Sequence, residues 1–475
     1  MSTRRAAKGY GSWWVAGAVA LAATLASQAA VAATVTVGPS CSLVNAVASV
    51  NALSNVGGCT RSGGGGERIS IPAGNYSVSQ ELNLTRSVRI TASLPGATIT
   101  SSAFSGLTHY GSSSSVPTVT IDNVTIKPNT ASSPIYCIIT NGVNLTLNNV
   151  STDACGLGLV VGEDGEPNTV NINNSRIVNS GWSGVLAHGV ILNVTGSTIS
   201  GNHDTGLSYY GRGDAVAVSI QGSTISGNGA TGLELNAGGN SWASDHTFKV
   251  ETSSIRGNGR SGVKYVGYPG QTMRIYRSLI ADNVSSENGG GIYSDGQTFI
   301  YASTVANNFS DAEGGGVYHT GAEFYLWHAT IAGNSSSSVG GGVRWTGSQG
   351  GIDYSIIAGN YGFTEGNARS RDINFGPTSG FKRYSLIGTI NGYSAVFAAG
   401  NGNVWGTLQS PLSPRLLGLG DYGGPTHTMA LRSTSPARDK IPTTDYQTPF
   451  STVVDQRGVA RPVNGKYDMG AYELQ

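Results

Sequence analysis

The sequence Ser-Thr-Ile-Ser-Gly-Asn occurs at residues 197–202 and returns unchanged at residues 223–228. Three residues after each copy ends comes a Thr-Gly-Leu triplet, at residues 205–207 and 231–233. Later copies carry Gly-Gly-Gly at the turn, at residues 289–291, 314–316 and 340–342. Self-similarity at a nearly fixed period is the signature of a repeat architecture.

One asparagine recurs from copy to copy, as Asn202, Asn228, Asn258, Asn283, Asn308, Asn334 and Asn360, at intervals of 25, 26 or 30 residues. Each copy consists of short β-branched runs between glycine turns, with too few residues in a 3.6-residue pattern for a helical repeat. We therefore predict an all-β fold, a single-stranded right-handed parallel β-helix of the pectate-lyase-like type. We expect the asparagines to stack at one corner as an amide ladder with a structural role.

Two other repeat folds fit less well. A β-propeller blade needs about 40 residues or more, and a calcium-binding roll needs a Gly- and Asp-rich nonapeptide that this chain lacks. Because an open coil edge invites aggregation, both ends need caps. We expect an N-terminal cap with a short helix near residues 41–47 and first coils within 33–100, the parallel β-helix over 101–388, and a C-terminal capping module over 389–475.

The first residues predict an export signal. Arg4, Arg5 and Lys8 precede an apolar run at residues 13–25, and Ala-Val-Ala at residues 30–32 offers a cleavage site. Residues 1–32 are therefore expected to be a signal peptide, with a retained membrane anchor as the alternative. The mature chain is expected to be secreted, extracellular or periplasmic, without a membrane span.

Charge and cysteine content narrow the partners and the compartment. The chain has 28 basic and 27 acidic side chains; removal of the three basic residues of the signal leaves 25 against 27, a net charge of −2. Nothing in this balance suggests nucleic acid as a partner. An even number of cysteines behind an export signal favours two disulfides. Of three possible connectivities, the simplest joins Cys41 to Cys59 and Cys137 to Cys155.

The two ends resemble known exported proteins. Residues 41–47, Cys-Ser-Leu-Val-Asn-Ala-Val, are similar to the start of bacterial β-helix proteins of the CSLREA type, although Val44-Asn45 replace the usual acidic residue. The closing segment, residues 415–474, resembles choice-of-anchor Q surface proteins, through Gly-Gly-Pro-Thr-His-Thr-Met-Ala-Leu (423–431), Ser-Pro-Ala-Arg-Asp (435–439), Asp-Gln-Arg-Gly (455–458), Arg-Pro (461–462) and Asp-Met-Gly-Ala-Tyr-Glu (468–473). The resemblance implies export and a β-helix body, and assigns no reaction. Members usually continue into an anchoring tail that is not seen before Gln475, so we expect release or non-covalent retention.

Outward positions of stacked coils form columns whose members lie about 4.8 Å apart. A first column follows the glycine turn and comprises Ser208, Glu234, Lys264, Tyr293, Tyr318 and Arg344. Two residues further along the same face lie Tyr210, Asn236 and Asp295. A second column, on the strand before the asparagine corner, comprises Glu251, Tyr276, Tyr301, Trp327 and Asp353, flanked by Lys249, Arg274, Phe299 and Tyr325.

Outward rings beside charged groups suit a sugar chain, because rings stack on pyranose faces and polar groups bind hydroxyls or carboxylates. We therefore predict binding of a polysaccharide or cell-surface glycan through Tyr210, Tyr318, Arg344, Asp295, Tyr276, Tyr301 and Trp327. The alternative is that these aromatic residues shield the sheet or pack beneath the C-terminal module.

The candidate catalytic residues are Lys264, Tyr293 and Glu234. A polysaccharide lyase needs a cation that neutralises a uronate carboxylate and a base, and Lys264 and Tyr293 on adjacent coils suit these roles. A glycosidase needs two carboxylates, and Glu234 and Asp295, two coils apart, reach the upper limit of the inverting range. The motif sets of polygalacturonases and pectate lyases are absent. Catalysis therefore stays open beside a non-catalytic adhesin or structural role, and no cofactor is expected, except calcium in the case of a lyase.

Overall fold

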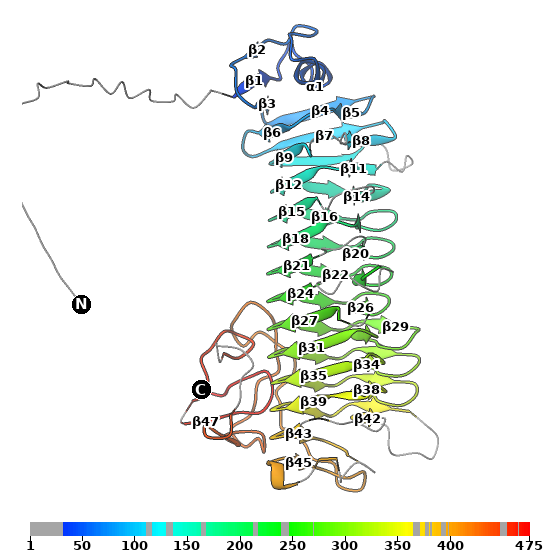
Figure 1. The fold of residues 1–475 in the computed structure, drawn as a ribbon, viewed down its shortest axis with the longest axis vertical. Helices are drawn as coiled ribbons and strands as arrows, with labels where there is room; N and C mark the ends of the chain where they lie inside the picture. The colour runs from blue at the N-terminus through cyan, green and yellow to red at the C-terminus, as the bar shows by residue number, and fades with distance from the viewer. Residues whose placement is uncertain are drawn as a thin grey trace, which may run out of the picture.

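The chain winds into a tall parallel β-solenoid, as the repeat predicts (Figure 1). The computed structural model describes residues 32–110, 116–129, 136–162, 168–211, 217–238, 247–268, 270–363, 371–375, 380, 382–390, 396–397, 399–446, 454–463 and 465–475. Residues 1–31 of the expected signal peptide lie outside these ranges. Within the described part of the chain, no helix is both long and apolar enough to cross a membrane.

Each coil contributes one strand to each of three long sheets. One coil, for example, contains β18 (Ile191–Thr195) in sheet 1, β19 (Thr198–Ser200) in sheet 2 and β20 (Leu207–Tyr210) in sheet 3. The next coil repeats the pattern, with Ile199 opposite Ile225 and Leu207 opposite Leu233. Apolar side chains alternate with polar ones along each strand, so that the apolar set fills the interior.

Sheet 3 carries the predicted first column. Its strands are β5 (Leu82–Leu84), β8 (Ser105–Tyr110), β11 (Tyr136–Asn141), β14 (Leu157–Val161), β17 (Val185–His188), β20, β23 (Leu233–Asn236), β26 (Val263–Val266), β30 (Ile292–Ser294), β34 (Val317–His319), β38 (Val343–Trp345) and β42 (Ile373–Phe375).

Sheets 1 and 2 complete the solenoid. The long parallel part of sheet 1 runs from β3 (Glu67–Ile71) to β43 (Lys382–Arg383) and includes β24 (Thr247–Glu251), β27 (Thr272–Tyr276), β31 (Gln297–Tyr301), β35 (Glu323–Trp327) and β39 (Gln349–Asp353). Sheet 2 runs from β4 (Gly74–Val78) to β45 (Val404–Trp405). A short fourth sheet lies between sheets 2 and 3 in the later coils and comprises β29 (Val284–Ser285), β33 (Phe309–Ser310), β37 (Ser335–Ser336) and β41 (Tyr361–Gly362).

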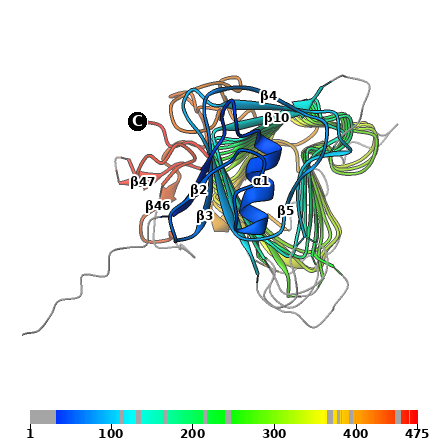
Figure 2. The same cartoon turned by 90° about the horizontal axis from the view of Figure 1, so that it is seen from above.

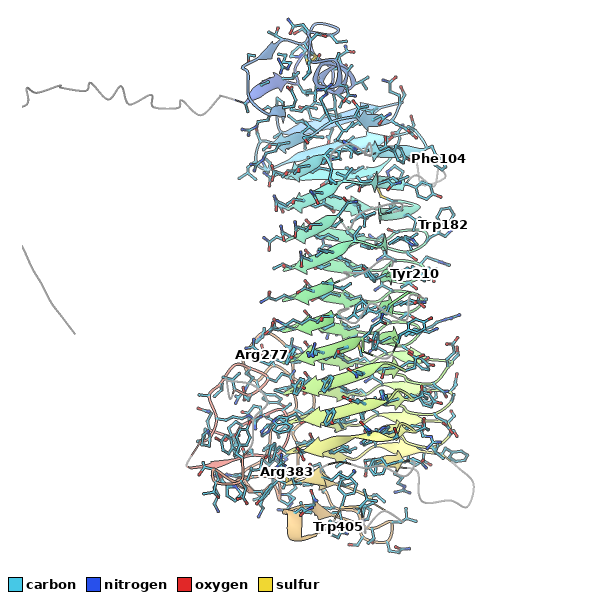
Figure 3. All side chains as sticks on the ribbon, viewed as in Figure 1. Phe104, Trp182, Tyr210, Arg277, Arg383 and Trp405 are labelled. Atoms are coloured by element: carbon cyan, nitrogen blue, oxygen red, sulfur yellow. A yellow bond between two sulfur atoms is a disulfide. The ribbon has the colours of Figure 1, made fainter. Side chains whose placement is uncertain are left out.

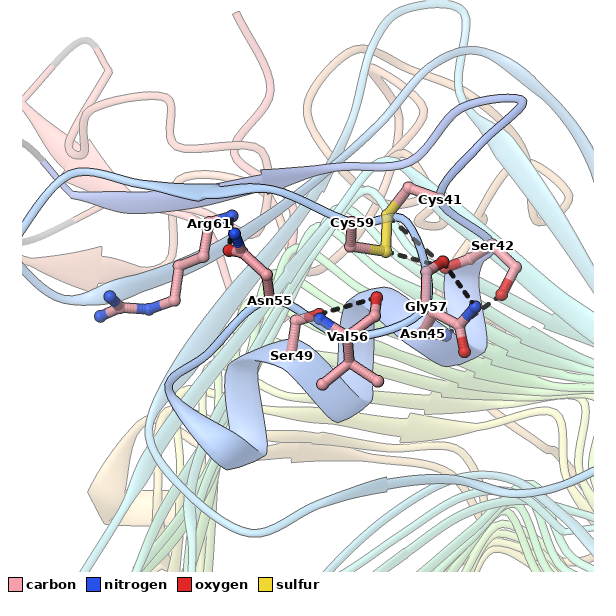
Figure 4. The surroundings of a disulfide bond; sticks show 9 residues. All are labelled: Cys41, Ser42, Asn45, Ser49, Asn55, Val56, Gly57, Cys59 and Arg61. Carbon is pink, nitrogen blue, oxygen red and sulfur yellow. Dashed lines mark hydrogen bonds between the residues drawn. A yellow bond between two sulfur atoms is a disulfide. The ribbon is translucent and has the colours of Figure 1, made fainter.

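The N-terminal cap contains the predicted helix. Helix α1 (Leu43–Ala52) lies across the open end of the first coils, beside β1 (Ala33–Thr36) and β2 (Arg61–Ser62) (Figure 2). Ser42 caps it by accepting a hydrogen bond from the Asn45 backbone N–H at 3.2 Å. The predicted Cys41–Cys59 disulfide ties the residue before this cap to the segment after the helix (Figure 4). The first sheet edge is thereby covered.

The asparagine ladder is present, and every step has the same form. Asn228, for example, donates its backbone N–H at 3.1 Å and its Nδ2 at 2.9 Å to Oδ1 of Asn258. The same Nδ2 also approaches the carbonyl of Ile199. The glycine of each Thr-Gly-Leu triplet is required here, because a Cβ on Gly206 would lie 2.6 Å from Nδ2 of Asn228. The ladder runs through Asn202, Asn228, Asn258, Asn283, Asn308, Asn334 and Asn360.

The two ends of the ladder differ from its interior. After Asn360 the acceptor is Asp372, a buried carboxyl. Asn202 lies three residues after Ile199, which pairs with Ile177 and, through it, with Thr152 on the two preceding coils. The equivalent corner positions on those coils are therefore occupied by Ser180 and Cys155. The predicted Cys137–Cys155 disulfide therefore takes the place of the ladder at this corner.

A second ladder, made of serine hydroxyls, lies at the corner between sheets 1 and 2. The Ser197 backbone N–H donates to Ser223 Oγ at 3.1 Å, and the Ser223 N–H donates to Ser253 Oγ at 3.1 Å. The same contact recurs through Ser278 and Ser303, and again at Ser355 and Ser385. Ala329 occupies one position of this series, where a methyl group replaces the hydroxyl.

The C-terminal segment folds back along a flank of the solenoid beside its later coils, as Figures 1 and 2 both show. Gln456 is one of its polar links to the coils: Oε1 accepts from Thr304 Oγ1 at 2.6 Å, and Nε2 donates to Thr426 Oγ1 and the His427 carbonyl within the segment. Arg461 is buried and donates to His328 Nδ1 at 2.9 Å and to Glu473 at 3.0 Å. Gln456, Arg461 and Glu473 therefore hold this segment together and attach it to the coils.

Candidate functional site

The outward positions of sheet 3 form one continuous column in the predicted register. Glu234 lies opposite Lys264, Lys264 opposite Tyr293, Tyr293 opposite Tyr318 and Tyr318 opposite Arg344. Their inward neighbours, from Leu233 to Val343, are buried. The sheet therefore brings an acid, a base and two phenols into one line on the outer face.

Lys264 is held between carboxylates from two elements. Its Nζ lies 4.0 Å from Glu234 Oε1 on the preceding coil and 3.8 Å from Glu287 Oε2. Glu287 also pairs with Arg260, at 3.4 Å. Glu287 could not be assigned to the column from the sequence, because it lies in the turn before a Gly-Gly-Gly copy, outside the period-2 pattern of the strands. Lys264 is an ion-paired cation in this arrangement.

Asp295 lies just after β30 and differs from the neighbouring carboxylates. Burial raises the pKa of its carboxyl, although the Gly267 N–H, which donates to Oδ1 at 2.8 Å, and the charge of Lys264 act in the opposite direction. Burial likewise raises the pKa of Tyr293, and the charge of Asp295 adds to the effect. Tyr293 is therefore a phenol at neutral pH, and Asp295 keeps its proton to a higher pH than an ordinary aspartic acid.

The other end of the column is fixed by Arg344. Its Nε donates to Glu313 at 3.0 Å and its Nη1 to Asn374 at 2.6 Å. Tyr293 and Tyr318 stack on each other, with ring centroids 5.6 Å apart and an angle of 15° between planes. Since the stacked faces cover each other, these rings present mainly their edges to a ligand. We call Glu234, Arg260, Lys264, Glu287, Tyr293, Asp295, Glu313, Tyr318 and Arg344 the sheet 3 cluster.

Tyr210 lies on the same sheet, nearer the N-terminus. It is 36% exposed and stacks on His188, with ring centroids 5.2 Å apart. The pairing of β20 with β23 places Tyr210 opposite Asn236, which lies two residues after Glu234. Tyr210 therefore extends the polar face of sheet 3 towards the earlier coils.

The second column also has the predicted register, with Tyr276 opposite Tyr301 and Tyr301 opposite Trp327. Tyr301 is only 8% exposed and stacks on Tyr276 at 5.0 Å, so its faces are not available to a ligand. Trp327 packs on the cluster of buried side chains formed with the C-terminal segment, edge to face with Tyr354 at 5.0 Å. Packing beneath the C-terminal segment, the alternative weighed for this column, describes Trp327. Tyr276 remains half-buried beside Lys249.

Where the structure describes the chain, no three or more His, Cys, Asp or Glu side chains are grouped as a metal ion would require. The sheet 3 cluster combines carboxylates and cations with two phenols, groups that form hydrogen bonds and ion pairs.

The chain belongs to the right-handed β-helix family. The model of the right-handed β-helix region matches residues 105–280 and, in a second overlapping placement, residues 183–360, which together span more than half of the 475 residues. This family membership confirms the predicted fold and its hand. No curated protein sequence matches the chain significantly.

Several solved structures are partly similar to this chain, and three of them are compared with it by identity, TM-score and coverage. The A-module of mannuronan C-5 epimerase AlgE6 from Azotobacter vinelandii shares 12% identity, with a TM-score of 0.47, over 68% of this chain and 91% of that one. The catalytic domain of a GH87 α-1,3-glucanase in complex with nigerose shares 14%, with a TM-score of 0.41, over 73% and 68%. Pectate lyase Pel9A shares 14%, with a TM-score of 0.34, over 86% and 88%. Similarity at this level says nothing about a shared reaction or ligand.

Proposed function

We propose that this protein is an exported β-helix that binds a polysaccharide along the outer face of sheet 3. The observation that carries the proposal is the in-register column of Glu234, Lys264, Tyr293, Tyr318 and Arg344, which offers donors and acceptors at every strand spacing. A regular series of this kind suits a polymer with repeating hydroxyls. Two disulfides, which persist in oxidising compartments, support export.

The charge of the cluster favours a largely uncharged glycan over a strongly acidic one. The cluster holds three cations, Arg260, Lys264 and Arg344, and four carboxyl groups, Glu234, Glu287, Asp295 and Glu313. Each cation is paired within the cluster, so none is left over to neutralise a uronate. Sugar hydroxyls, in contrast, bind to carboxylates and cations that are already paired.

Binding is tested with the purified protein on a panel of neutral and acidic polysaccharides, by affinity electrophoresis and co-sedimentation. We expect a neutral glycan to be retained and the variants Glu234→Gln and Lys264→Ala to bind it more weakly. Lys127→Ala, which removes an exposed lysine from sheet 2, is the matched control and should bind as the wild type does. A folded protein that retains no member of the panel would contradict the proposal.

Cleavage of the bound glycan is a second candidate, and the raised pKa of Asp295 favours hydrolysis. Asp295 would protonate the leaving oxygen, and Glu234 would activate a water molecule, as in an inverting glycosidase. Glu234 lies two coils and two strand positions from Asp295, so their Cα atoms are roughly 12 Å apart and the two side chains would have to lean towards each other to reach the inverting range. The β-elimination considered from the sequence requires a cation free to meet a uronate carboxylate, and Lys264 is paired on both sides. The non-catalytic adhesin remains the alternative.

Hydrolysis is tested by incubating the retained glycan with the protein and measuring new reducing ends. Asp295→Asn keeps the acceptor for the Gly267 N–H and removes the acid, so it should abolish release while binding persists. Unsaturated products, detected by ultraviolet absorbance, would instead indicate β-elimination. Retention without either product would favour the adhesin.

A further inference from the structure

Three aromatic side chains lie at the corner between sheets 2 and 3 in the earlier coils. Phe104 precedes β8, Tyr136 opens β11 and Trp182 precedes β17. Ring centroids are 4.9 Å apart between Phe104 and Tyr136, and 6.1 Å apart between Tyr136 and Trp182. Phe104 is 66% exposed and Trp182 47% exposed. We call these three residues the aromatic patch; Figure 3 shows Phe104, Trp182 and Tyr210 one below another along one edge of the solenoid.

The rings of the aromatic patch are arranged differently from the stacked rings of the two columns. Phe104 meets Tyr136 edge to face, at 88°, and Tyr136 and Trp182 are tilted by 43°. Tyr293 and Tyr318, in contrast, lie nearly parallel and cover each other. An exposed ring that is not stacked on a parallel neighbour keeps a face free for the apolar side of a pyranose.

The backbone beneath the aromatic patch is held rigidly. Cys137, which follows Tyr136, forms the disulfide with Cys155. The Trp182 N–H donates to the Gly156 carbonyl at 2.8 Å, and the Tyr136 N–H donates to Phe104 at 3.0 Å. A preorganised set of rings loses less entropy when a ligand binds.

The aromatic patch is continuous with the sheet 3 cluster. Backbone bonds run down the same corner from Arg260 to Ala230, from Ala230 to Asp204 and from Asp204 to Trp182. Trp182 and Arg260 are therefore three strand spacings apart, roughly 14 Å. Arg260 pairs with Glu287, which pairs with Lys264. Beside the aromatic patch, the outer face of sheet 3 is apolar, with Ile139, Val160 and Leu186 in one column.

From these observations we infer that the aromatic patch is a distal binding subsite for the same polysaccharide, where uncharged pyranose rings stack on Phe104 and Trp182. This inference rests on the proposed function. One end of the glycan chain lies on the sheet 3 cluster, and the chain runs along the solenoid axis towards the N-terminal cap. Long chains contact both regions, whereas short oligosaccharides fill only one of them.

The test measures affinity by calorimetry for a length series of oligosaccharides cut from the retained glycan. The double variant Phe104→Ala/Trp182→Ala is compared with Leu94→Ala, which removes a 75% exposed apolar side chain from the corner between sheets 1 and 2. Loss of the two ring contacts should weaken the binding of long chains to the double variant about tenfold, equivalent to about 1.4 kcal/mol. It should bind as the wild type does to the shortest oligosaccharides that still require Lys264. Leu94→Ala should bind every length as the wild type does.

The outcomes separate the two proposals. If the wild type binds no polysaccharide, the proposed function fails and the inference fails with it. If the wild type binds and the double variant shows unchanged affinity for every length, the inference alone is overturned. It is also overturned if sedimentation shows that the wild type is a dimer and the double variant a monomer, since the aromatic patch would then be an interface between two copies. A change in tryptophan emission on adding long chains, absent in Trp182→Phe, would support the inference independently.

Discussion

Asp372 ends the asparagine ladder by accepting two hydrogen bonds from Asn360, from its backbone N–H at 2.8 Å and from its Nδ2 at 2.9 Å. An eighth asparagine would accept the same two bonds, but the last position holds an ionisable group. Burial raises the pKa of Asp372 to about 6, against the bonds from Asn360 and Thr389 that lower it. This end of the ladder is therefore sensitive to pH.

Asp372→Asn should flatten the pH dependence of stability in the mildly acidic range. The folded-state pKa of Asp372 lies above the ordinary value of 3.8. Its contribution to the free energy of unfolding is therefore fully present below pH 3.8 and is lost as pH rises through 6. The loss amounts to about 3 kcal/mol. Thermal melts of the wild type and the variant from pH 3.5 to 7.5 should show a difference that grows across this window. A constant difference would show that Asp372 does not titrate there.

Titration of His319 should change stability with pH in the opposite direction to that of Asp372. Its Nδ1 lies 2.7 Å from Ser294 Oγ in the interior, and burial lowers the pKa of its ring to about 4. The unfolded chain therefore binds a proton that the folded chain does not, and stability falls by about 3 kcal/mol as pH drops from 6.5 to 4. His319→Gln keeps a partner for Ser294 and should remove this acid sensitivity in the same melts. Equal acid sensitivity in both proteins would contradict the prediction.

Ala329→Ser should stabilise the fold. The new hydroxyl would continue the serine ladder between Ser303 and Ser355, accepting from the Ser303 N–H and donating to the Trp327 carbonyl, as Ser355 donates to Asp353. One added buried hydrogen bond contributes about 1 kcal/mol. Urea denaturation should show a higher midpoint with an unchanged slope. Ala329→Cys, similar in size and a weaker hydrogen-bonding group, should gain less.

Arg461→Ala should detach the C-terminal segment. The guanidinium lies between His328, Glu473 and the carbonyls of Asp468 and Gly470, and its removal leaves the carboxylate of Glu473 buried without its ion-pair partner. Removing one partner of such a buried pair lowers the free energy of unfolding by about 3–5 kcal/mol. Limited proteolysis should then remove residues beyond β45 while the coils resist. Arg432→Ala, an exposed arginine of the same segment, is the control and should leave the digestion pattern of the wild type.

The repeat period and the alternation of apolar and polar residues predicted the structure correctly wherever one coil repeats the pattern of the next. The inward set that includes Leu207 and Val343, the outward column from Glu234 to Arg344 and the asparagine ladder all follow from identical local patterns on successive coils. The prediction failed where the contact is not periodic. Glu287 and Glu313 lie in turns, and Asp372 follows Asn360 by only 12 residues, so its spacing conceals its place in the ladder.

Contacts between distant segments were also beyond the periodic signal. The residues around Tyr301 and Trp327 left open whether the second column faces solvent or packs beneath the C-terminal module, because Trp327 is covered by side chains that lie about a hundred residues later in the chain. The aromatic patch falls in coils that precede the first ladder asparagine, where no shared motif aligns Phe104, Tyr136 and Trp182.

Every interior step of the asparagine ladder makes the same bonds, whether 25 or 30 residues separate its members. A coil can therefore be duplicated or deleted without altering the chemistry of the coils above and below it. Unequal recombination between repeats of the gene would lengthen or shorten the outer face of sheet 3 by one strand spacing at a time. The length of this outer face is thus a trait that selection can adjust in whole units.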